Sequence, residues 1–244
     1  MQLLRARHSD DPVLDAAITH ALLRQVATGA QPPTARVFRP GATMAFGRLD
    51  ALSAGYAAAR AAATAHGYAP LLRLGGGHAA GYDAGSVLVE ILRPERTIAG
   101  GIPERFASAT ALLVDTLAAL GVEARVGALP GEYCAGDWSV NAAGVKLAGT
   151  AQRSIRGASL VTAMLIVQRG DRLRAALVDV YAALGIAWRP STAGAAQDLR
   201  PGVSAADAER ALIATLAAHE RLVAGELGAE TMALAQDLRA AHER

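Results

Sequence analysis

The chain has 244 residues, of which 52% are hydrophobic and 19% charged, and its formal net charge is +2. This composition is typical of a globular protein and excludes an intrinsically disordered one. The nearly balanced charge and an aromatic content of 4% also exclude a basic, aromatic-rich nucleic-acid surface.

Membrane and export signals are missing from the sequence as well. No apolar stretch reaches the roughly 18 residues that span a bilayer. The N-terminal stretch from Met1 to His8 lacks the apolar core and cleavage site of a signal peptide. The single cysteine excludes an internal disulfide and fits a reducing compartment. We therefore expect a cytoplasmic protein without a membrane partner.

The first half of the chain predicts helices and short strands. Asp10 or Asp11 can cap a helix that begins near Pro12, and Gly29 ends its apolar periodicity. The other elements expected here are strands over 35–38, 43–46, 69–74 and 86–92, and helices over 51–66 and 103–120.

The second half predicts more strands and then helices. We expect strands over 123–126, 138–140, 146–148 and 159–167, an irregular loop over 188–203, and helices over 173–184, 205–227 and 231–243. Strands mixed irregularly with helices favour an α+β fold. We expect a single domain over 1–244, with a central mixed, mainly antiparallel sheet flanked by helices and a helical C-terminal part from about residue 205.

A glycine-rich segment lies between two of the expected strands. Gly75, Gly76 and Gly77 allow the backbone to approach a ligand closely and to point N–H groups at an anionic or carbonyl oxygen. No Gly-Lys-Ser/Thr follows, and no helix obviously begins there, so the segment is neither a Walker loop nor a dinucleotide fingerprint. Taken alone, it fits a flexible loop equally well.

Lys146 is the only lysine in a chain with 24 basic Lys and Arg residues, and Cys134, shortly before it, is the only cysteine. A position that stays lysine where arginine is used everywhere else indicates a need for a compact ammonium with three rotatable donors. A leftover lysine on a solvated turn and a small buried cysteine are the simpler interpretations of each residue alone. Their short spacing makes a joint role the stronger hypothesis.

Two sequence motifs carry a resemblance to a known family. The segment from Leu72 to Asp83, LRLGGGHAAGYD, aligns without a gap with Arg-Arg-x-Ser/Thr-Gly-Gly-(Arg/Gly)-x-Val-x-His-Asp, and the segment from Gly144 to Arg153, GVKLAGTAQR, matches Gly-(Arg/Lys)-Lys-(Ile/Val)-(Ala/Ser)-Gly-(Ser/Thr)-Ala-Gln-Arg almost completely. Both motifs resemble those of the lipoate–protein ligase and octanoyltransferase family, which is related to biotin–protein ligases. The resemblance covers roughly residues 10–185 and implies the biotin/lipoate protein ligase-like fold.

The resemblance also implies a site. Its catalytic residues would be Cys134 and Lys146, without a metal, and its substrate-binding residues would be Arg73, Gly75, Gly76, Gly77, His78, Asp83, Gly149, Thr150, Ala151 and Gln152. Leu72, Gly75 and Tyr82 depart from the family motif, which leaves the acyl substrate open. A solvent-facing loop position is as good an interpretation of His78 as a ligand contact.

Two chemistries occur in such a family. Octanoyltransferases take an acyl group from acyl carrier protein onto a cysteine and pass it to a lysine of a lipoyl-domain protein, such as glycine-cleavage H protein or a 2-oxoacid dehydrogenase subunit; no cofactor is required. Ligases use ATP and magnesium to form an acyl-adenylate. The segment around Cys134 resembles the cysteine loop of one transferase class, and a neighbouring cation such as Lys146 favours a thiolate. We expect the transferase, with the ligase second and a non-catalytic paralogue that binds acyl groups or carrier proteins third.

Overall fold

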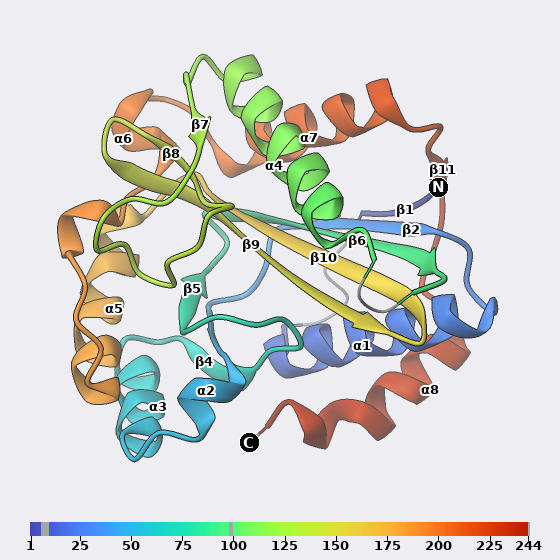
Figure 1. Ribbon diagram of the computed structural model, residues 1–244, viewed down its shortest axis with the longest axis horizontal. Coiled ribbons are helices and arrows are strands. Elements are labelled where there is room, and N and C mark those ends of the chain that lie inside the picture. Colours follow the sequence, from blue (N-terminus) through green and yellow to red (C-terminus); the bar gives the residue numbers. More distant parts are fainter. Residues whose placement is uncertain (6–9, 98–99, 244) are drawn as a thin grey trace.

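The computed structural model describes residues 1–5, 10–97 and 100–243 (Figure 1). The expectation about the N-terminal stretch therefore falls partly on residues 6–8, outside the described residues. The helices are α1 (Pro12–Thr28), α2 (Arg48–Ala51), α3 (Tyr56–Ala65), α4 (Ile102–Ala119), α5 (Gly170–Leu184), α6 (Ala196–Leu199), α7 (Ala205–His219) and α8 (Ala229–Leu238), with single 3₁₀ turns at Pro190–Thr192 and Arg239–Ala241.

The strands form one large and one small sheet. They are β1 (Gln2–Leu4), β2 (Thr34–Phe38), β3 (Thr43–Phe46), β4 (Ala69–Leu72), β5 (Ala80–Tyr82), β6 (Ser86–Glu95), β7 (Arg125–Val126), β8 (Val140–Ala142), β9 (Val145–Ile155), β10 (Gly157–Ile166) and β11 (Val223–Ala224). The large sheet has the order β11-β1-β2-β6-β10-β9-β8-β7. Its pairs are antiparallel except that β1 runs parallel to both β2 and β11. The predicted mixed, mainly antiparallel sheet is thus confirmed.

Helices cover both faces of this sheet, because side chains alternate between the two faces along each strand. Val87 and Val89 of β6 pack with Leu113 of α4 on one face, whereas Leu92 packs with Leu22 of α1 on the other. Figure 1 shows α4 and α7 on the first side, and α1 and α8 on the second. The two faces hold separate hydrophobic clusters, and the predicted α+β architecture is confirmed.

The small sheet has the order β4-β3-β5, and it carries the glycine-rich segment between β4 and β5. A third hydrophobic cluster joins it to α3 and α5. The sequence pattern did not predict strand β5, because the central residue of this strand is Gly81. A Cβ there would lie 2.6 Å from Leu173 Cδ1 and 3.0 Å from Met44 Cε, so close packing requires a glycine inside this strand.

The N-terminal helix begins and ends where the sequence predicts. The Asp11 carboxylate accepts hydrogen bonds from the backbone N–H groups of Val13 and Leu14, and Gly29 closes the helix with a φ of 78°. The helix expected over 51–66 instead forms two helices, α2 and α3. Gly55 lies between them, where a Cβ would fall 1.9 Å from the Ala183 carbonyl oxygen.

The C-terminal part is not purely helical, which corrects the expectation from residue 205. Helix α7 ends at His219, and β11 follows it and joins the edge of the large sheet. Its partner β1 lies at the other end of the chain, so no local pattern predicts this pairing. In the loop expected over 188–203, a 3₁₀ turn and α6 occur. None of the described helices has the length and apolar character needed to cross a bilayer.

Candidate active site

A cavity of about 370 Å³ lies between the α1 face of the large sheet and the small sheet. Both sequence motifs contribute to its wall. Of the residues predicted for the site, it is lined by Cys134, Lys146, Arg73, Gly75, Gly76, Gly77, Gly149, Thr150, Ala151 and Gln152. The sequence motifs thus meet in one cavity, as the resemblance implies.

Cys134 lies in the loop that precedes β8, and its backbone is held in an uncommon conformation. Its φ of +43° is in the left-handed region, which costs energy for a residue other than glycine. The Cys134 backbone N–H donates to Tyr181 Oη at 2.7 Å, and the Tyr181 hydroxyl donates to the Ala79 carbonyl at 2.9 Å. Tertiary contacts therefore fix where the half-buried thiol points.

The cation that contacts the sulfur is Arg73. Its Nη2 lies 3.3 Å from Cys134 Sγ and also donates to the His78 carbonyl at 2.8 Å. Gly77 makes this contact possible, because a Cβ there would fall 2.8 Å from Sγ and 2.6 Å from Arg73 Nη2. A guanidinium thus contacts the sulfur directly, whereas Lys146, the cation expected beside the thiol, contacts the backbone carbonyl of Cys134.

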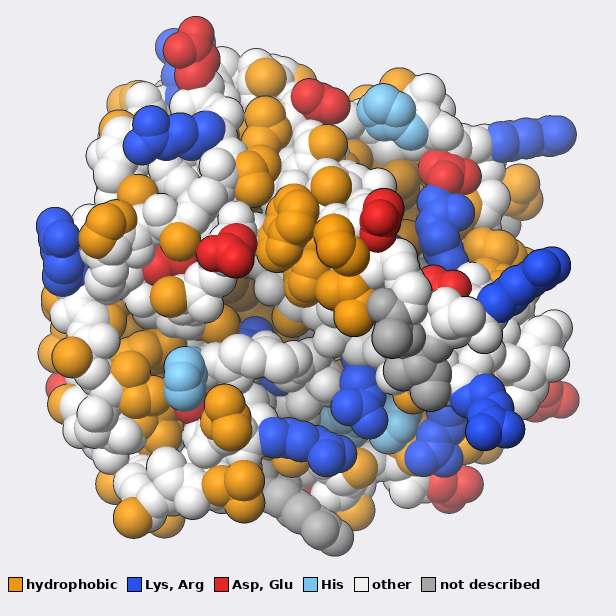
Figure 2. Space-filling view, in the orientation of Figure 1, with side chains coloured by type: hydrophobic (Ala, Val, Ile, Leu, Met, Phe, Trp, Pro, Cys, Tyr) orange, Lys and Arg blue, Asp and Glu red, His pale blue; other side chains and the backbone are white. Residues whose placement is uncertain are grey.

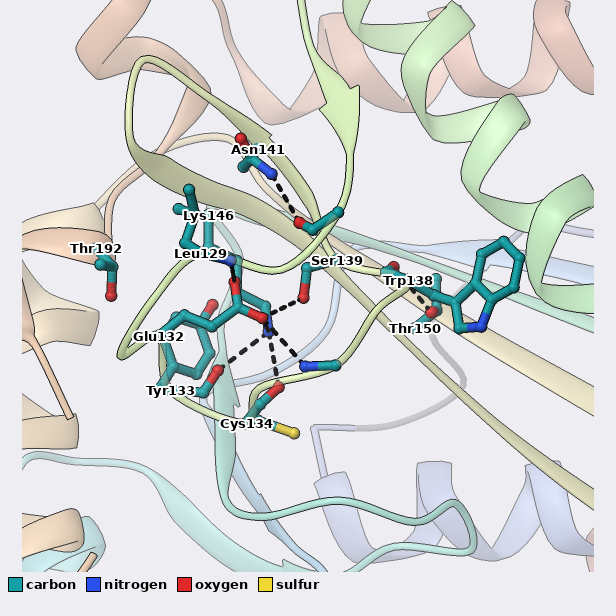
Figure 3. A network of polar contacts seen from close by, with 12 residues as sticks. Leu129, Glu132, Tyr133, Cys134, Trp138, Ser139, Asn141, Lys146, Thr150 and Thr192 are labelled. Carbon is teal, nitrogen blue, oxygen red and sulfur yellow. Dashed lines mark hydrogen bonds and ion pairs between the residues drawn. The ribbon is translucent and has the colours of Figure 1, made fainter. Parts of the chain in front are cut away.

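Lys146 of β9 reaches the cysteine loop with its ammonium group (Figure 3). Its ammonium donates to the carbonyl of Cys134 at 2.8 Å, to the carbonyl of Tyr133 at 3.0 Å and to Glu132 Oε1 at 3.3 Å. The side chain is 2% exposed, and burial lowers the pKa of Lys146 below its usual value. Three acceptors in three directions suit an ammonium and not a planar guanidinium.

Glu132 is a part of this arrangement that the sequence reasoning missed. Its Oε1 also accepts hydrogen bonds from the backbone N–H of Gly136 and from Ser139 Oγ, and Oε2 accepts from the backbone N–H of Leu129. One buried carboxylate thus ties both ends of the loop to Lys146 (Figure 3). The signal in the sequence that could have identified Glu132 is an acidic residue two positions before the only cysteine.

Aromatic and polar contacts hold another part of the wall. Trp138 stacks on Phe106 of α4, with ring centroids 5.7 Å apart and an interplanar angle of 13°. Thr150 Oγ1 donates to the Trp138 carbonyl at 3.2 Å. Gln152 Oε1 accepts a hydrogen bond from Arg105 Nε at 2.9 Å. These contacts join α4 to β9 at the cavity.

A second set of charged residues lies where α1 crosses β2 and β6. The Arg36 side chain is fully buried and pairs with Asp15 at 2.5 Å and with Glu90 at 3.5 Å. Thr19 Oγ1 lies 2.8 Å from both carboxylate oxygens of Glu90. Burial raises the pKa of Glu90. Asp15, Thr19 and Glu90 line the cavity, so this part of an otherwise largely apolar wall is polar.

Two of the predicted binding residues do not line the cavity. His78 Nδ1 contacts Asp50 Oδ1 at 2.7 Å, and its side chain is 40% exposed. The Asp83 carboxylate accepts from the backbone N–H of Gly85 and lies 3.2 Å from Arg172 Nη1, which stabilises the turn into β6. In this structure, His78 and Asp83 make contacts within the protein and not with the cavity.

Comparisons with known proteins identify the family of the chain. The family model described as lipoyl protein ligase A/B catalytic domain matches residues 11–214. A Geobacillus kaustophilus protein named octanoyl-[GcvH]:protein N-octanoyltransferase is 30% identical over 178 residues, which are 71% of this chain and 63% of that protein. A protein of the same name from Exiguobacterium sibiricum is 38% identical over 122 residues, 49% of this chain and 44% of that protein. The chain thus matches less than two thirds of the length of either relative.

Solved structures show the same fold. A bipartite lipoate protein ligase from Thermoplasma acidophilum superposes with a TM-score of 0.72 at 20% identity, covering 98% of this chain and 91% of that one. A lipoate-protein ligase A bound with ATP gives a TM-score of 0.73 at 20% identity, covering 98% and 93%. The predicted lipoate ligase-like fold is thereby confirmed. With its two motifs, its fold and a family match over most of its length, the chain belongs to the lipoyl protein ligase A/B catalytic domain family.

Proposed function

We propose that this chain is an octanoyltransferase that carries the octanoyl group as a thioester on Cys134 and passes it to a lysine of a lipoyl-domain protein. The observation that carries the proposal is the position of the thiol. Cys134 lies in a cavity with a largely apolar wall, in a conformation fixed by Tyr181 and Lys146, with a guanidinium 3.3 Å from its sulfur. Such a cation favours the thiolate, which is the nucleophilic form.

In the first step the Cys134 thiolate attacks the octanoyl carbonyl, a carbon–sulfur bond forms, and the bond to the donor breaks. A thiol donor leaves as a thiolate, whereas an amine donor takes up a proton as it leaves. In the second step the neutral amine of the acceptor lysine attacks the thioester and forms an amide as the carbon–sulfur bond breaks. The amine loses its proton to Lys146, where that residue has given one up, or to solvent, and Cys134 is restored as a thiolate. Arg73 stabilises the charged sulfur at the start and at the end of this sequence.

In this mechanism Lys146 has two roles: it fixes the position of the cysteine loop, and it donates a proton. Its ammonium binds the carbonyls of the two peptide groups that flank Cys134, those of Tyr133 and of Cys134 itself, and so keeps the sulfur beside Arg73. Because its pKa is lowered, the ammonium gives up a proton more readily than an exposed lysine. It is suited to supply the proton that an amine leaving group needs.

The identity of the octanoyl donor is a further part of the proposal. The sequence predicts acyl carrier protein, and the names of the two relatives place the octanoyl group on GcvH. We infer that octanoylated GcvH is the better donor and that a second lipoyl-domain protein is the acceptor. In this proposal neither ATP nor magnesium takes part.

The test is an intact-mass assay with purified enzyme and an unmodified lipoyl domain. Octanoylated GcvH and octanoyl-carrier protein are supplied separately, each without ATP, and the expected result is an octanoyl group on the acceptor with at least the first donor. Cys134→Ala should abolish this transfer. Acylation that requires ATP and free octanoic or lipoic acid, and that survives Cys134→Ala, would show a ligase instead. No acylation under any of these conditions would favour the non-catalytic paralogue.

A further inference from the structure

Beside the candidate active site lies a second cavity of about 290 Å³. The two cavities share Arg73, Leu74 and His242 in their walls. The second one is therefore adjacent to the guanidinium that contacts the Cys134 sulfur. A protein that delivers an acyl group to Cys134, or removes it, has to cover the surface near this point.

Arginines from separate elements converge on this second cavity. Arg24 comes from α1, Arg48 from α2 and Arg153 from β9, and each is exposed. Within the described residues, the lining contains no carboxylate, and these three guanidinium groups have no ion pair. Figure 2 shows basic side chains gathered beside a histidine on this face.

Several other arginines of the chain are paired with carboxylates instead. Arg36 is paired with Asp15, Arg105 with Glu95 and Arg239 with Asp11. Like charges gathered without counter-charges repel one another, and they create a positive potential that attracts an anionic partner. The neighbouring His20 is affected by this potential. Burial, together with the charges of His242, Arg24 and Arg153, lowers the pKa of His20 to about 4.

Two exposed apolar side chains, Leu49 of α2 and Leu52 directly after it, follow Arg48 in the chain. Leu49 is 66% exposed and Leu52 is 84% exposed. Asp50 accepts a hydrogen bond from the backbone N–H of Gly47 at the start of the helix, and it contacts His78, which directly follows the glycine-rich segment. Arginine and exposed apolar side chains on a rigid support are typical of protein interfaces.

We propose that Arg24, Arg48 and Arg153, together with Leu49 and Leu52, form the docking surface for a lipoyl-domain protein whose surface beside the modified lysine is acidic. This inference rests on the proposed function, because that function requires a protein substrate to bind beside the active-site cavity. The arginines draw in and orient the acidic surface, and the leucines bury apolar area against it. The reaction of Cys134 with a small thioester substrate does not need these residues.

Binding is tested first, without chemistry. In a Cys134→Ala background, the affinity for unmodified GcvH is measured by titration calorimetry for the parent and for the added pair Arg24→Glu and Arg48→Glu. The matched control is Arg200→Glu with Arg221→Glu, which changes the net charge equally near the ends of α7, on the opposite face of the large sheet. The docking pair should weaken binding by at least tenfold at low salt and flatten its salt dependence. The control pair should change binding by less than twofold, and equal effects of the two pairs would overturn the proposal.

A second measurement separates docking from catalysis. With Cys134 intact, the enzyme is mixed with octanoyl-pantetheine, a small thioester that makes no protein contact, and the adduct is followed by mass. The docking pair should form the adduct at the parent rate while losing at least tenfold in kcat/KM for the lipoyl-domain acceptor. A parallel loss in both reactions would overturn docking and assign the arginines to the fold or the acyl site. If the parent forms no adduct with octanoyl-pantetheine or with octanoylated GcvH, the proposed function fails, and the binding titration still decides whether this surface docks GcvH.

Discussion

Two buried ion networks contribute to the wall of the same cavity, and they are built differently. At Lys146 the ammonium has one carboxylate partner, Glu132, and two backbone carbonyl partners, all within the cysteine loop. At Arg36 the guanidinium joins Asp15 of α1 to Glu90 of β6. The first network connects a strand to a loop in an uncommon conformation, whereas the second connects regular elements to each other.

This difference indicates what each network is for. Removing Arg36 breaks the ion pairs that it makes with two buried carboxylates, and the cost falls on the packing of α1 against the sheet. Changing the shape of the cation at Lys146 leaves the charge in place and moves the loop that presents Cys134. We therefore expect the Arg36 network to control stability and the Lys146 network to control acyl transfer.

The largest expected effect is on stability, at Arg36. Arg36→Met should lower the free energy of unfolding by about 3–5 kcal/mol, because it removes the buried cation that pairs with both Asp15 and Glu90. Urea denaturation at pH 7 measures this change. The control is Arg39→Met, which breaks a pair with Glu209 whose arginine is 51% exposed and should cost less than about 1 kcal/mol. Equal effects of the two variants would contradict the contrast between the networks.

The second prediction concerns the shape of the cation at Lys146. Lys146→Arg should lower acyl transfer more than tenfold, which corresponds to about 1.4 kcal/mol or more, because a planar guanidinium cannot reach the carbonyls of Tyr133 and Cys134 as the ammonium does. Circular dichroism and the urea midpoint establish that the fold is retained. Near-normal transfer in a folded variant would show that the ammonium is dispensable.

A smaller effect is expected at Arg73. Arg73→Gln removes the cation 3.3 Å from the sulfur and should slow the alkylation of Cys134 by iodoacetamide at pH 7 several-fold. Arg105→Gln is the matched control, since Arg105 contacts Gln152 and Glu95 instead of the thiol. An unchanged alkylation rate in Arg73→Gln would remove Arg73 from the account of the nucleophile.

The last expected effect is a pH dependence at the paired histidines beside the docking surface. Burial and the nearby cationic groups lower the pKa of His20 to about 4, so between pH 6.5 and 4 the unfolded chain binds more protons than the folded one. The free energy of unfolding should therefore fall as the pH decreases through this window. His20→Gln should show a shallower decrease in the same urea titrations, and an identical slope would contradict it.

Local sequence signals predicted much of this fold because the responsible interactions are local. The carboxylate of Asp11, followed by Pro12, sets the start of α1, and the β-branched residues of β6 indicate its strand. By contrast, β11 depends on pairing with β1, and the break between α2 and α3 depends on Gly55 meeting Ala183. Contacts between distant segments leave no periodic trace in either partner.

The candidate site was predictable to a similar degree. The scarcity of lysine and cysteine singled out Lys146 and Cys134, and the two motifs brought the glycine-rich segment to the same cavity. The partner of the sulfur was not predictable, because it depends on the positive φ of Gly77 and on the path of Arg73 across it. Asp83 follows the motif and lies outside the cavity, since its carboxylate is used by a turn and by Arg172.

The most direct test of the central claim is to map the acyl group after the enzyme alone has been incubated with the octanoyl donor. The account predicts an octanoyl adduct on the Cys134 peptide that forms without ATP or magnesium, is released by neutral hydroxylamine and is absent from Cys134→Ala. Cys134→Ser should form at most a slow, more stable ester, because a hydroxyl is a weaker nucleophile at neutral pH. An unmodified Cys134 in an enzyme that acylates its acceptor only with ATP and free acid would contradict the account.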